Sequence, residues 1–527
     1  MPRTRLRNEA IILEKSYRRW IALIAMSLGT FMGLLDVTVV NVALPTMAEH
    51  FNETFTNLQW VLNIYTLVLA VSLLILSKMG DMYGRKRIFL ASIVIFVIAS
   101  AVNAMAPNLL ILNIGRAVQA IGGAGMNSLA MALVASNFSG RQRGLALGIL
   151  GSVIGMSTAS GPLIGGYLVG QFGWSSIFYV NVPVGIITVI LTIIYVKETP
   201  SYGAHDRIDF AGMLLSAATL FSLIYGLIQK EGHPHWNWTS PQVAGWLVAA
   251  VLLFAVFIYV EAHVKAPMVN LEMFKSRHFI GTIVVAFTLG VAIYSFNAFL
   301  TVLMQNYIGY SAFQTGVRQL TISIWSLLLG PITGLLGARF SKKRMISLSL
   351  FVGGIGFLLM MNAMTVNVSF GQMWPAMILM GITNGMVNPL LNTAGMEGMA
   401  PQEMGMASGL INVFRQIGTT VGVVGLGLIQ DRHYENYLAG HMGSLTMPSA
   451  AKSAIHKALV AAGPFSGHEI AFSTRMSKMP FAHALQHVVV SAYTGSMAAI
   501  TLTAAVVLVI SGVLAALLMR DQPAARG

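Results

Sequence analysis

The sequence predicts an all-α polytopic membrane protein of about fourteen transmembrane helices, arranged as two six-helix bundles with two extra central helices. Composition, a series of long apolar windows and an internal repeat all predict this fold class. Of the 527 residues, 56% are hydrophobic and only 9% are charged, whereas a soluble domain carries about 25% charged residues. Apolar stretches of about 20 residues, long enough to cross a bilayer, recur along the whole chain.

Fourteen apolar windows follow one another. They lie near residues 20–44, 58–76, 88–105, 109–134, 145–169, 177–195, 210–227, 243–260, 279–303, 317–336, 345–364, 374–396, 407–429 and 491–519. The first window is too long for the apolar region of a signal peptide and lacks an A-x-A cleavage site. We therefore expect it to be retained as the first membrane helix.

The two halves of the chain carry similar loops. SKMGDMYGRKR at 77–87 and GLLGARFSKKR at 334–344 align at an offset of 257 residues (337 − 80). The same offset matches six windows of the first half with six of the second. We predict a bundle over 1–196, an insertion of two helices over 197–276, and a second bundle over 277–527 with a long outer loop at 430–487. Duplicated helix bundles of this kind are the architecture of secondary transporters.

The positive charge of the chain, +14 in total, is concentrated in alternate loops. The basic loop residues are Lys78, Arg85, Lys86, Arg87, Arg141, Arg143, Lys197, Arg207, Lys265, Lys275, Arg277, Arg339, Lys342, Lys343 and Arg344. By the positive-inside rule, these loops and both termini are cytoplasmic in a bacterial-type cell membrane. The charge therefore indicates topology and contact with anionic membrane lipid rather than binding to nucleic acid. The chain has no cysteine, which excludes thiol chemistry.

Charged residues inside apolar windows are costly and are candidates for function. Asp36, Arg116, Arg318 and Arg415 occupy such positions. Asp36 lies eight residues before the outer end of its window and Arg116 seven residues after the outer start of its own. At 1.5 Å per residue these depths are about 12 Å and about 10 Å, so the two side chains can form a pair. A permanent structural ion pair is an alternative to a titrating one.

Small residues dominate the segment 148–166. One face of a helix, counted in steps of three and four, is formed by Gly148, Gly151, Gly155, Thr158, Pro162 and Gly165. Such a face allows close approach of another helix in lipid, and a proline interrupts the backbone hydrogen bonds at one level. A tightly packed structural helix explains the pattern equally well. In the twelfth window, Asn384, Asn388 and Asn392 form a polar stripe that suits a pathway or interhelical hydrogen bonding.

Several segments resemble those of a known transporter family. GILGSVIGMSTASGPLIGG at 148–166 resembles the fifth-helix antiporter motif of major facilitator drug:proton antiporters, with Ser157 where glycine is usual. The loop at 77–87 resembles the family motif between helices two and three, with departures at Ser77 and Met82. Five further segments resemble signatures of the fourteen-helix branch of this family. They are LLDVTVVNVALP (34–45), QWVLNIYTL (59–67), RAVQAIGGAG (116–125), WSSIFYVNVPVG (174–185) and VFRQIGTTVG (413–422).

The resemblance implies a major facilitator fold and a role for each motif. Asp36 is then the proton carrier and Arg116 its partner. The conformational latch comprises Gly80, Asp81, Gly84, Arg85 and Lys86, and the second half carries Ala338 in place of the aspartate. The antiporter motif comprises Gly148, Gly155, Gly161, Pro162, Gly165 and Gly166. Candidate pathway residues are Asn41, Tyr65, Gln119, Asn384, Asn388 and Arg415.

We therefore predict a proton-coupled antiporter that exports small amphipathic compounds, cationic or zwitterionic, across the cytoplasmic membrane. It is expected to act as a monomer driven by the proton motive force, with no cofactor and no metal. One alternative is an exporter of a single dedicated lipid, antibiotic or metabolite. A transport-inactive receptor or scaffold is a more distant alternative. The sequence contains neither an H-E-x-x-H motif nor a pair of acids within the apolar windows, either of which would have suggested an enzyme.

Overall fold

The computed structural model describes residues 2–53, 55–199, 209–233, 236–264, 267–337, 339–400, 403–445 and 447–520, and within these ranges every regular element is a helix. This confirms the predicted fold class. Ala338, part of the predicted asymmetry of the latch, lies outside the described residues.

The first half of the chain forms a bundle of long helices. The first runs 50 residues and contains the whole predicted window 20–44. The helices are α1 (Pro2–Phe51), α2 (Phe55–Tyr83), α3 (Arg85–Ala104), α4 (Leu109–Asn137), α5 (Gly140–Phe172), α6 (Ser176–Tyr179) and α7 (Asn181–Tyr195).

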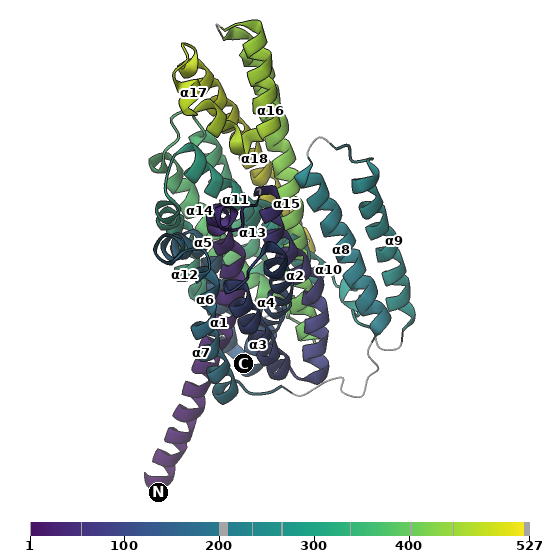
Figure 1. The fold of residues 1–527 in the computed structure, drawn as a ribbon. Coiled ribbons are helices and arrows are strands. Elements are labelled where there is room, and N and C mark those ends of the chain that lie inside the picture. Colours follow the sequence, from purple (N-terminus) through teal and green to yellow (C-terminus); the bar gives the residue numbers. More distant parts are fainter. Residues whose placement is uncertain are drawn as a thin grey trace.

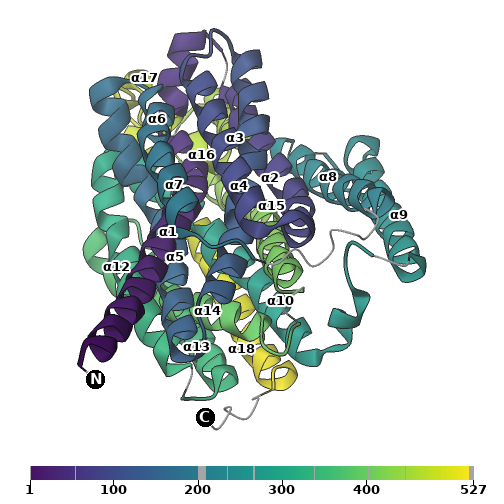
Figure 2. The ribbon, with the colours of Figure 1, turned by 90° about the horizontal axis from the view of Figure 1, so that it is seen from below.

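Two central helices, α8 (Phe210–Gly232) and α9 (Pro241–His263), form an antiparallel pair. Figures 1 and 2 show this pair at one side of the molecule, where α8 contacts α2 and α15. The two helices therefore flank the contact between the halves rather than separating them. The domain boundaries at 196 and 276 stay predictions.

The second half repeats the helix starts of the first. α2 and α12 begin at residues 55 and 312, and α3 and α13 begin at residues 85 and 342, in both cases 257 residues apart (312 − 55 and 342 − 85). The elements are η1 (Leu271–Lys275), α10 (Arg277–Leu289), η2 (Gly290–Tyr294), α11 (Ser295–Val302), η3 (Leu303–Tyr307), α12 (Ala312–Leu336), α13 (Lys342–Ala363), α14 (Phe370–Gly395), α15 (Met404–His441), η4 (Met442–Ser444), α16 (Ser449–Ala471), α17 (Thr474–Ser477) and α18 (Ala482–Leu518).

Twelve helices in the described part of the chain are long and apolar enough to cross a membrane, or 13 if the bent α5 counts as one span. The remaining predicted window, 374–396, lies in α14, a helix of 26 residues that packs against α12, α13 and α5. The three asparagines of α14 lower its apolar character. The fourteen predicted windows therefore correspond to helices that differ in hydrophobicity. Figure 1 marks both chain ends at one end of the molecule, which we call the terminal end.

The predicted long connection at 430–487 is mostly helical. α15 continues 12 residues beyond the predicted end of its window at residue 429, and α18 begins at residue 482 instead of 491. Between them α16 runs over Ser449–Ala471 and bends at Gly463, whose φ of 66° is in the left-handed region that favours glycine. We call the end of the molecule that carries α16 and α17 the α16 end (Figure 1).

The α16 helix is docked on the second half. Tyr307 of η3 donates its hydroxyl to the carbonyl oxygen of Pro464 at 2.6 Å and stacks on Tyr493 of α18. The ring of His468 lies 5.0 Å from that of Tyr307. Burial lowers the pKa of His468, while the charge of Glu469 opposes this shift. The side chain of His468 is therefore part of the packed contact between α16 and η3.

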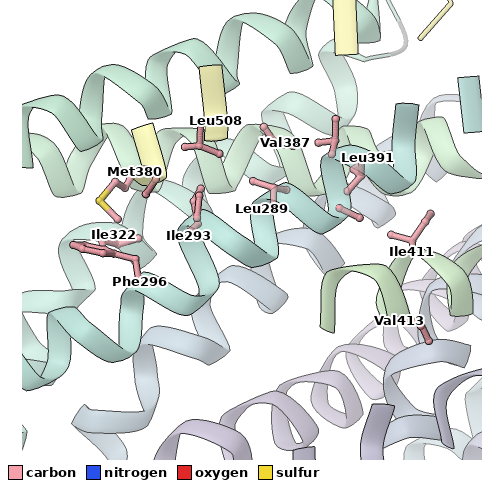
Figure 3. Close-up of a cluster of buried hydrophobic side chains, with 14 of the residues drawn as sticks. Leu289, Ile293, Phe296, Ile322, Met380, Val387, Leu391, Ile411, Val413 and Leu508 are labelled. Carbon is pink, nitrogen blue, oxygen red and sulfur yellow. The ribbon is translucent and has the colours of Figure 1, made fainter. Parts of the chain in front are cut away.

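The core of the second half surrounds the π-helix η2. Figure 3 shows Leu289, Ile293 and Phe296 beside apolar side chains of α14 and α18. These three residues recur at helical spacing on one face, which is buried against the core. The figure also labels Ile322, Met380, Val387, Leu391, Ile411, Val413 and Leu508, all of them buried. The next residue after Ile293, Tyr294, is thereby turned toward a different side of the helix.

Candidate functional site

Asp36 of α1 and Arg116 of α4 form a buried ion pair within the first half. Arg116 Nη1 contacts Asp36 Oδ2, and the exposed fractions of the two side chains are both 0%. The sequence predicted that these two charged residues lie at similar depths in the membrane, and the structure brings them into contact. Because each ion balances the charge of the other, both can be held in a low-dielectric interior.

Amide and hydroxyl side chains complete this pair. Gln119 donates to Asp36 Oδ1 at 2.9 Å and accepts from Arg116 at 2.9 Å. Asn181, at the start of α7, donates to Asp36 Oδ1 at 3.4 Å and to Ser100 Oγ at 3.0 Å. The carboxylate therefore accepts hydrogen bonds from α4 and α7 in addition to its ion pair, and four helices meet around it.

The guanidinium of Arg116 is held on its other sides by α2. Its Nε donates to the carbonyl oxygen of Val61 at 3.1 Å, and its Cζ lies 4.1 Å from the ring centroid of Tyr65. Tyr65 in turn donates its hydroxyl to the carbonyl oxygen of Gly33 in α1, at 3.0 Å. A change in the charge of Asp36 would therefore alter contacts made by α1, α2, α4 and α7 together.

A second charged group joins the two halves at the terminal end. Asp81 near the end of α2 accepts from Arg85 Nε at 2.8 Å and from the backbone N–H of Met406 at 3.1 Å. Ser77, one turn earlier, donates to the carbonyl oxygen of Gly405. Met406 lies in the first turn of α15, where backbone N–H groups lack partners within the helix and attract negative charge. Asp81 thus caps a helix of the other half.

Gly84 and Lys86 hold the start of α3. Gly84 has a φ of 105°, a conformation that side chains with a Cβ rarely adopt. The carboxylate of Glu198 accepts from the backbone N–H groups of Lys86 at 2.9 Å and Arg87 at 3.1 Å. A Cβ on Gly84 would lie 2.8 Å from the Glu198 carboxyl carbon, and one on Gly80 would meet Leu129. These latch residues therefore fix a tight turn between α2 and α3.

One stretch of α5 packs directly on the second half. A Cβ on Gly148 would lie 2.5 Å from the carbonyl oxygen of Gly330 in α12, and one on Gly151 would lie 2.9 Å from Pro389 in α14. At Gly155 a Cβ would lie 2.7 Å from Asn384 Nδ2 and 2.9 Å from Ser326. Any larger residue would push the neighbouring helices away, so small residues set the separation of the two halves here.

The rest of the antiporter motif has different neighbours. α5 is bent by 50° between Gln142–Ser157 and Ser160–Phe172, and Pro162 lies just beyond the bend. A Cβ on Gly161 would meet Thr38 of α1, one on Gly165 would lie 2.9 Å from Val39 of α1, and one on Gly166 would lie 2.7 Å from Phe313 of α12. The residues of the predicted face over 148–165 therefore have different neighbours: Gly148, Gly151 and Gly155 pack on the second half, whereas Gly165 packs on α1.

The second half contains its own buried polar cluster. Tyr294 donates to Asn388 Oδ1 at 3.2 Å, and Asn388 donates to Asn384 Oδ1 at 2.6 Å. Arg415 of α15 contacts Asn412 Oδ1 through Nη2, and its Cζ lies 5.7 Å from the ring centroid of Tyr294. Three of the predicted pathway residues, from α14 and α15, thus belong to one cluster.

Not every predicted position joins a site. Asn41 is exposed and donates only weakly, at 3.4 Å, to the carbonyl oxygen of Val37 in its own helix. Arg318 lies over the ring of Tyr310, away from both clusters. The sequence reading did not single out Ser100, Asn181 or Tyr294. An amide within the apolar window 177–195 was the available signal for Asn181, whereas nothing in the local pattern distinguishes Tyr294.

Comparison with known proteins identifies the family. The model of the Major Facilitator Superfamily matches residues 26–423. The chain is 32% identical over 415 residues to the multidrug resistance protein Stp of Mycobacterium tuberculosis, covering 78% of this chain and 75% of Stp. It is 30% identical to the tetracenomycin C resistance and export protein of Streptomyces glaucescens, covering 78% and 76% of the two chains. It is also 30% identical to the methylenomycin A resistance protein of Bacillus subtilis, covering 80% and 90%.

Solved structures show the same fold. The human organic anion transporter MFSD10 superposes with a TM-score of 0.58 over 94% of this chain and 99% of that one, at 12% identity. The proton:xylose symporter XylE superposes with a TM-score of 0.57 over 80% and 90%, also at 12% identity. Family and fold indicate a multi-pass membrane transporter rather than an enzyme. The chain belongs to the Major Facilitator Superfamily.

Proposed function

We propose that this protein is a proton-coupled antiporter that exports small amphipathic compounds, cationic or zwitterionic, across the cytoplasmic membrane. Relatives at 30–32% identity are named for multidrug resistance and for antibiotic resistance and export, which supports drug efflux. The terminal end faces the cytoplasm in this proposal, because the basic loops lie there. The monomer is the working unit, and the proton gradient supplies the energy.

The observation that carries the proposal is the ion pair of the buried Asp36 carboxylate with Arg116. An ionised Asp36 balances Arg116. When Asp36 takes up a proton, its negative charge is lost and Arg116 is left buried without a counter-charge, which is unfavourable. The two states therefore favour different arrangements of α1, α2, α4 and α7. A proton that enters from outside and leaves to the cytoplasm can in this way be exchanged for cargo.

The size of the driving force is adequate. At a membrane potential of ~150 mV, one entering proton releases about 3.5 kcal/mol, from 2.3 kcal/mol per 100 mV. Since 1.4 kcal/mol corresponds to a factor of ten, one proton per neutral cargo molecule sustains a gradient of roughly a few hundredfold. The proposal needs no cofactor to reach a useful degree of export.

Flux in proteoliposomes tests the proposal. The purified full chain is reconstituted, a pH gradient is imposed, and a small panel of cationic and zwitterionic dyes is followed by fluorescence. We expect uphill movement of several dyes that a protonophore abolishes. Dye movement at a rate that does not depend on the pH gradient would contradict proton coupling. The absence of any dye flux would favour a transport-inactive protein.

A second candidate is export of one dedicated compound. It is favoured by the names of two relatives, which mention tetracenomycin C and methylenomycin A singly. Expression in a host that lacks its own drug pumps separates the two candidates. Resistance to several unrelated compounds supports the first proposal, and resistance to a single compound class supports the second.

A further inference from the structure

We propose that Arg415 and the polar residues around it bind an acidic group of the cargo, a carboxylate or a similar organic anion on an amphipathic molecule. This inference rests on the proposed function, because it names the chemical class of the exported compound. Within the two classes proposed above, it selects the zwitterion over the pure cation.

Arg415 is a buried cation without an acidic partner in the described part of the chain. Its exposed fraction is 8%. Nη2 contacts Asn412 Oδ1, while Nη1 is buried and has no hydrogen-bond partner among the described residues. Arg116 and Arg85, in contrast, contact Asp36 and Asp81. A buried guanidinium that is only partly satisfied has unused donors for an anion, which would balance its charge.

The surroundings of Arg415 combine an aromatic ring with polar side chains, which suits a ligand that has polar and aromatic parts. The ring of Tyr294 lies on one side, and its hydroxyl leads to Asn388 and Asn384. Tyr294 ends the π-helix η2, a rare distortion that is frequent at functional sites. The backbone of Arg415 packs directly on Gly290 at the start of η2, where a Cβ would meet its carbonyl oxygen. The π-helix and the arginine are therefore positioned together.

The cluster lies near the middle of the membrane and at the contact between the halves. Arg415 is 11 residues from the start of α15 at Met404, about 16 Å along the helix and half of a hydrocarbon core of about 30 Å. Asn384 donates to Ser326 at 3.1 Å, and both surround Gly155 of the first half. Transporters of duplicated architecture bind substrate at this level between their repeats.

The charges of the two halves favour an acid-bearing cargo. In the first half the positive charge of Arg116 is balanced by Asp36. In the second half, the guanidinium of Arg415 contacts the amide of Asn412 and the ring of Tyr294, and no carboxylate among the described residues contacts it. A purely cationic molecule would be repelled by Arg415, whereas a zwitterion would place its acid there. A structural role for Arg415 alone predicts no preference between an acid and its ester.

The experiment compares two dyes that differ at one group, rhodamine 110 with a free carboxyl and rhodamine 123, its methyl ester. Binding to the purified full chain is measured by fluorescence anisotropy at pH 7. We expect wild type to bind the acid more tightly. Arg415→Gln should lose affinity for the acid by about tenfold to a hundredfold and change the ester by less than about twofold, as expected for a charge-assisted hydrogen bond. Arg415→Lys should keep part of the preference.

Arg318→Gln is the matched control, because it removes the same charge from a position over Tyr310 outside the cluster. It should keep the wild-type preference. Equal affinity of wild type for both dyes, or an equal loss of both in Arg415→Gln, would overturn the inference. Proton-driven flux of both dyes distinguishes the two proposals. Proton-driven flux without any preference for the acid in binding removes only this inference. Preferred binding of the acid without proton-driven flux of the acid removes only proton coupling.

Discussion

The carboxylate of Asp81 in α2 accepts a hydrogen bond from the backbone N–H of Met406 in α15, at 3.1 Å. A side chain of the first half therefore caps the first turn of a helix in the second half, beside the donor contact of Ser77 with Gly405. This contact can form only when the terminal ends of the two halves are together, so it favours that arrangement over one in which they separate.

Asp81→Asn should slow transport while leaving cargo affinity nearly unchanged. The amide lacks the charge that attracts both Arg85 and the start of α15, so the ratio of closed to open terminal ends should fall by about tenfold. Initial rates in proteoliposomes and dye affinity in detergent give the two readouts. Glu272→Gln, at an exposed ion pair with Lys275, is the control and should transport normally. A large change in affinity with unaltered turnover would argue against this role.

Gly155→Leu should fold but transport poorly or leak protons. The new side chain would collide with Asn384 and Ser326, which lie within 3 Å of the position of a Cβ. Overpacking of this kind costs about 1–3 kcal/mol, which shifts the halves apart without unfolding them. Gly170→Leu makes the same change in the same helix where nothing lies within 4 Å, and should be silent. Normal, tightly coupled transport by Gly155→Leu would mean that this contact does not seal the pathway.

Asn181→Ala should destabilise the protein and weaken proton-driven export. It removes two hydrogen bonds, to Ser100 and Asp36, although Gln119 still donates to both acceptors. Each lost hydrogen bond is worth about 1 kcal/mol, so the melting temperature of a chain of this size should fall by about one to three degrees. Asn237→Ala, at an exposed loop position, serves as the comparison. If both variants melt and transport like wild type, Asn181 is not part of the working network.

Tyr307→Phe should loosen the α16 helix. The hydroxyl that donates to Pro464 is lost, while stacking on Tyr493 is kept. The loss of one hydrogen bond is worth about 1 kcal/mol, or roughly fivefold faster amide exchange in α16 if this segment opens locally. Hydrogen exchange measured by mass spectrometry checks this expectation, with Tyr167→Phe at an exposed site as the control. Unchanged exchange in α16 would show that the hydroxyl does not hold it.

The sequence predicted the parts of the fold that depend on local hydrophobicity. Apolar windows place the long helices, and the repeated loops place the starts of α3 and α13 257 residues apart (342 − 85). The approach of Asp36 to Arg116 followed from depth alone. Contacts that depend on how helices pack were not predictable: of the single face expected from helical counting, Gly155 packs on α12 and α14 whereas Gly165 packs on α1.

The polar helices were also hard to read from sequence. The extension of α15 to His441 and the docking of α16 depend on packing between segments far apart in the chain, such as Tyr307 against Pro464. Tyr294 lies in an apolar stretch and becomes part of a polar cluster only because η2 and α14 come together in three dimensions. Periodicity reports the environment of a whole helix face, and a single polar contact on that face leaves no periodic signal.

The central claim is that Asp36 couples protons to export, and the most direct test is flux by Asp36→Asn in proteoliposomes. Exchange of labelled dye for unlabelled dye at equal pH is measured alongside and reports whether the variant is folded and binds cargo. The account predicts that Asp36→Asn retains this exchange and loses uphill export driven by a pH gradient, because the carboxylate that carries the proton is absent. Uphill, pH-driven export by Asp36→Asn at the wild-type rate would contradict the account.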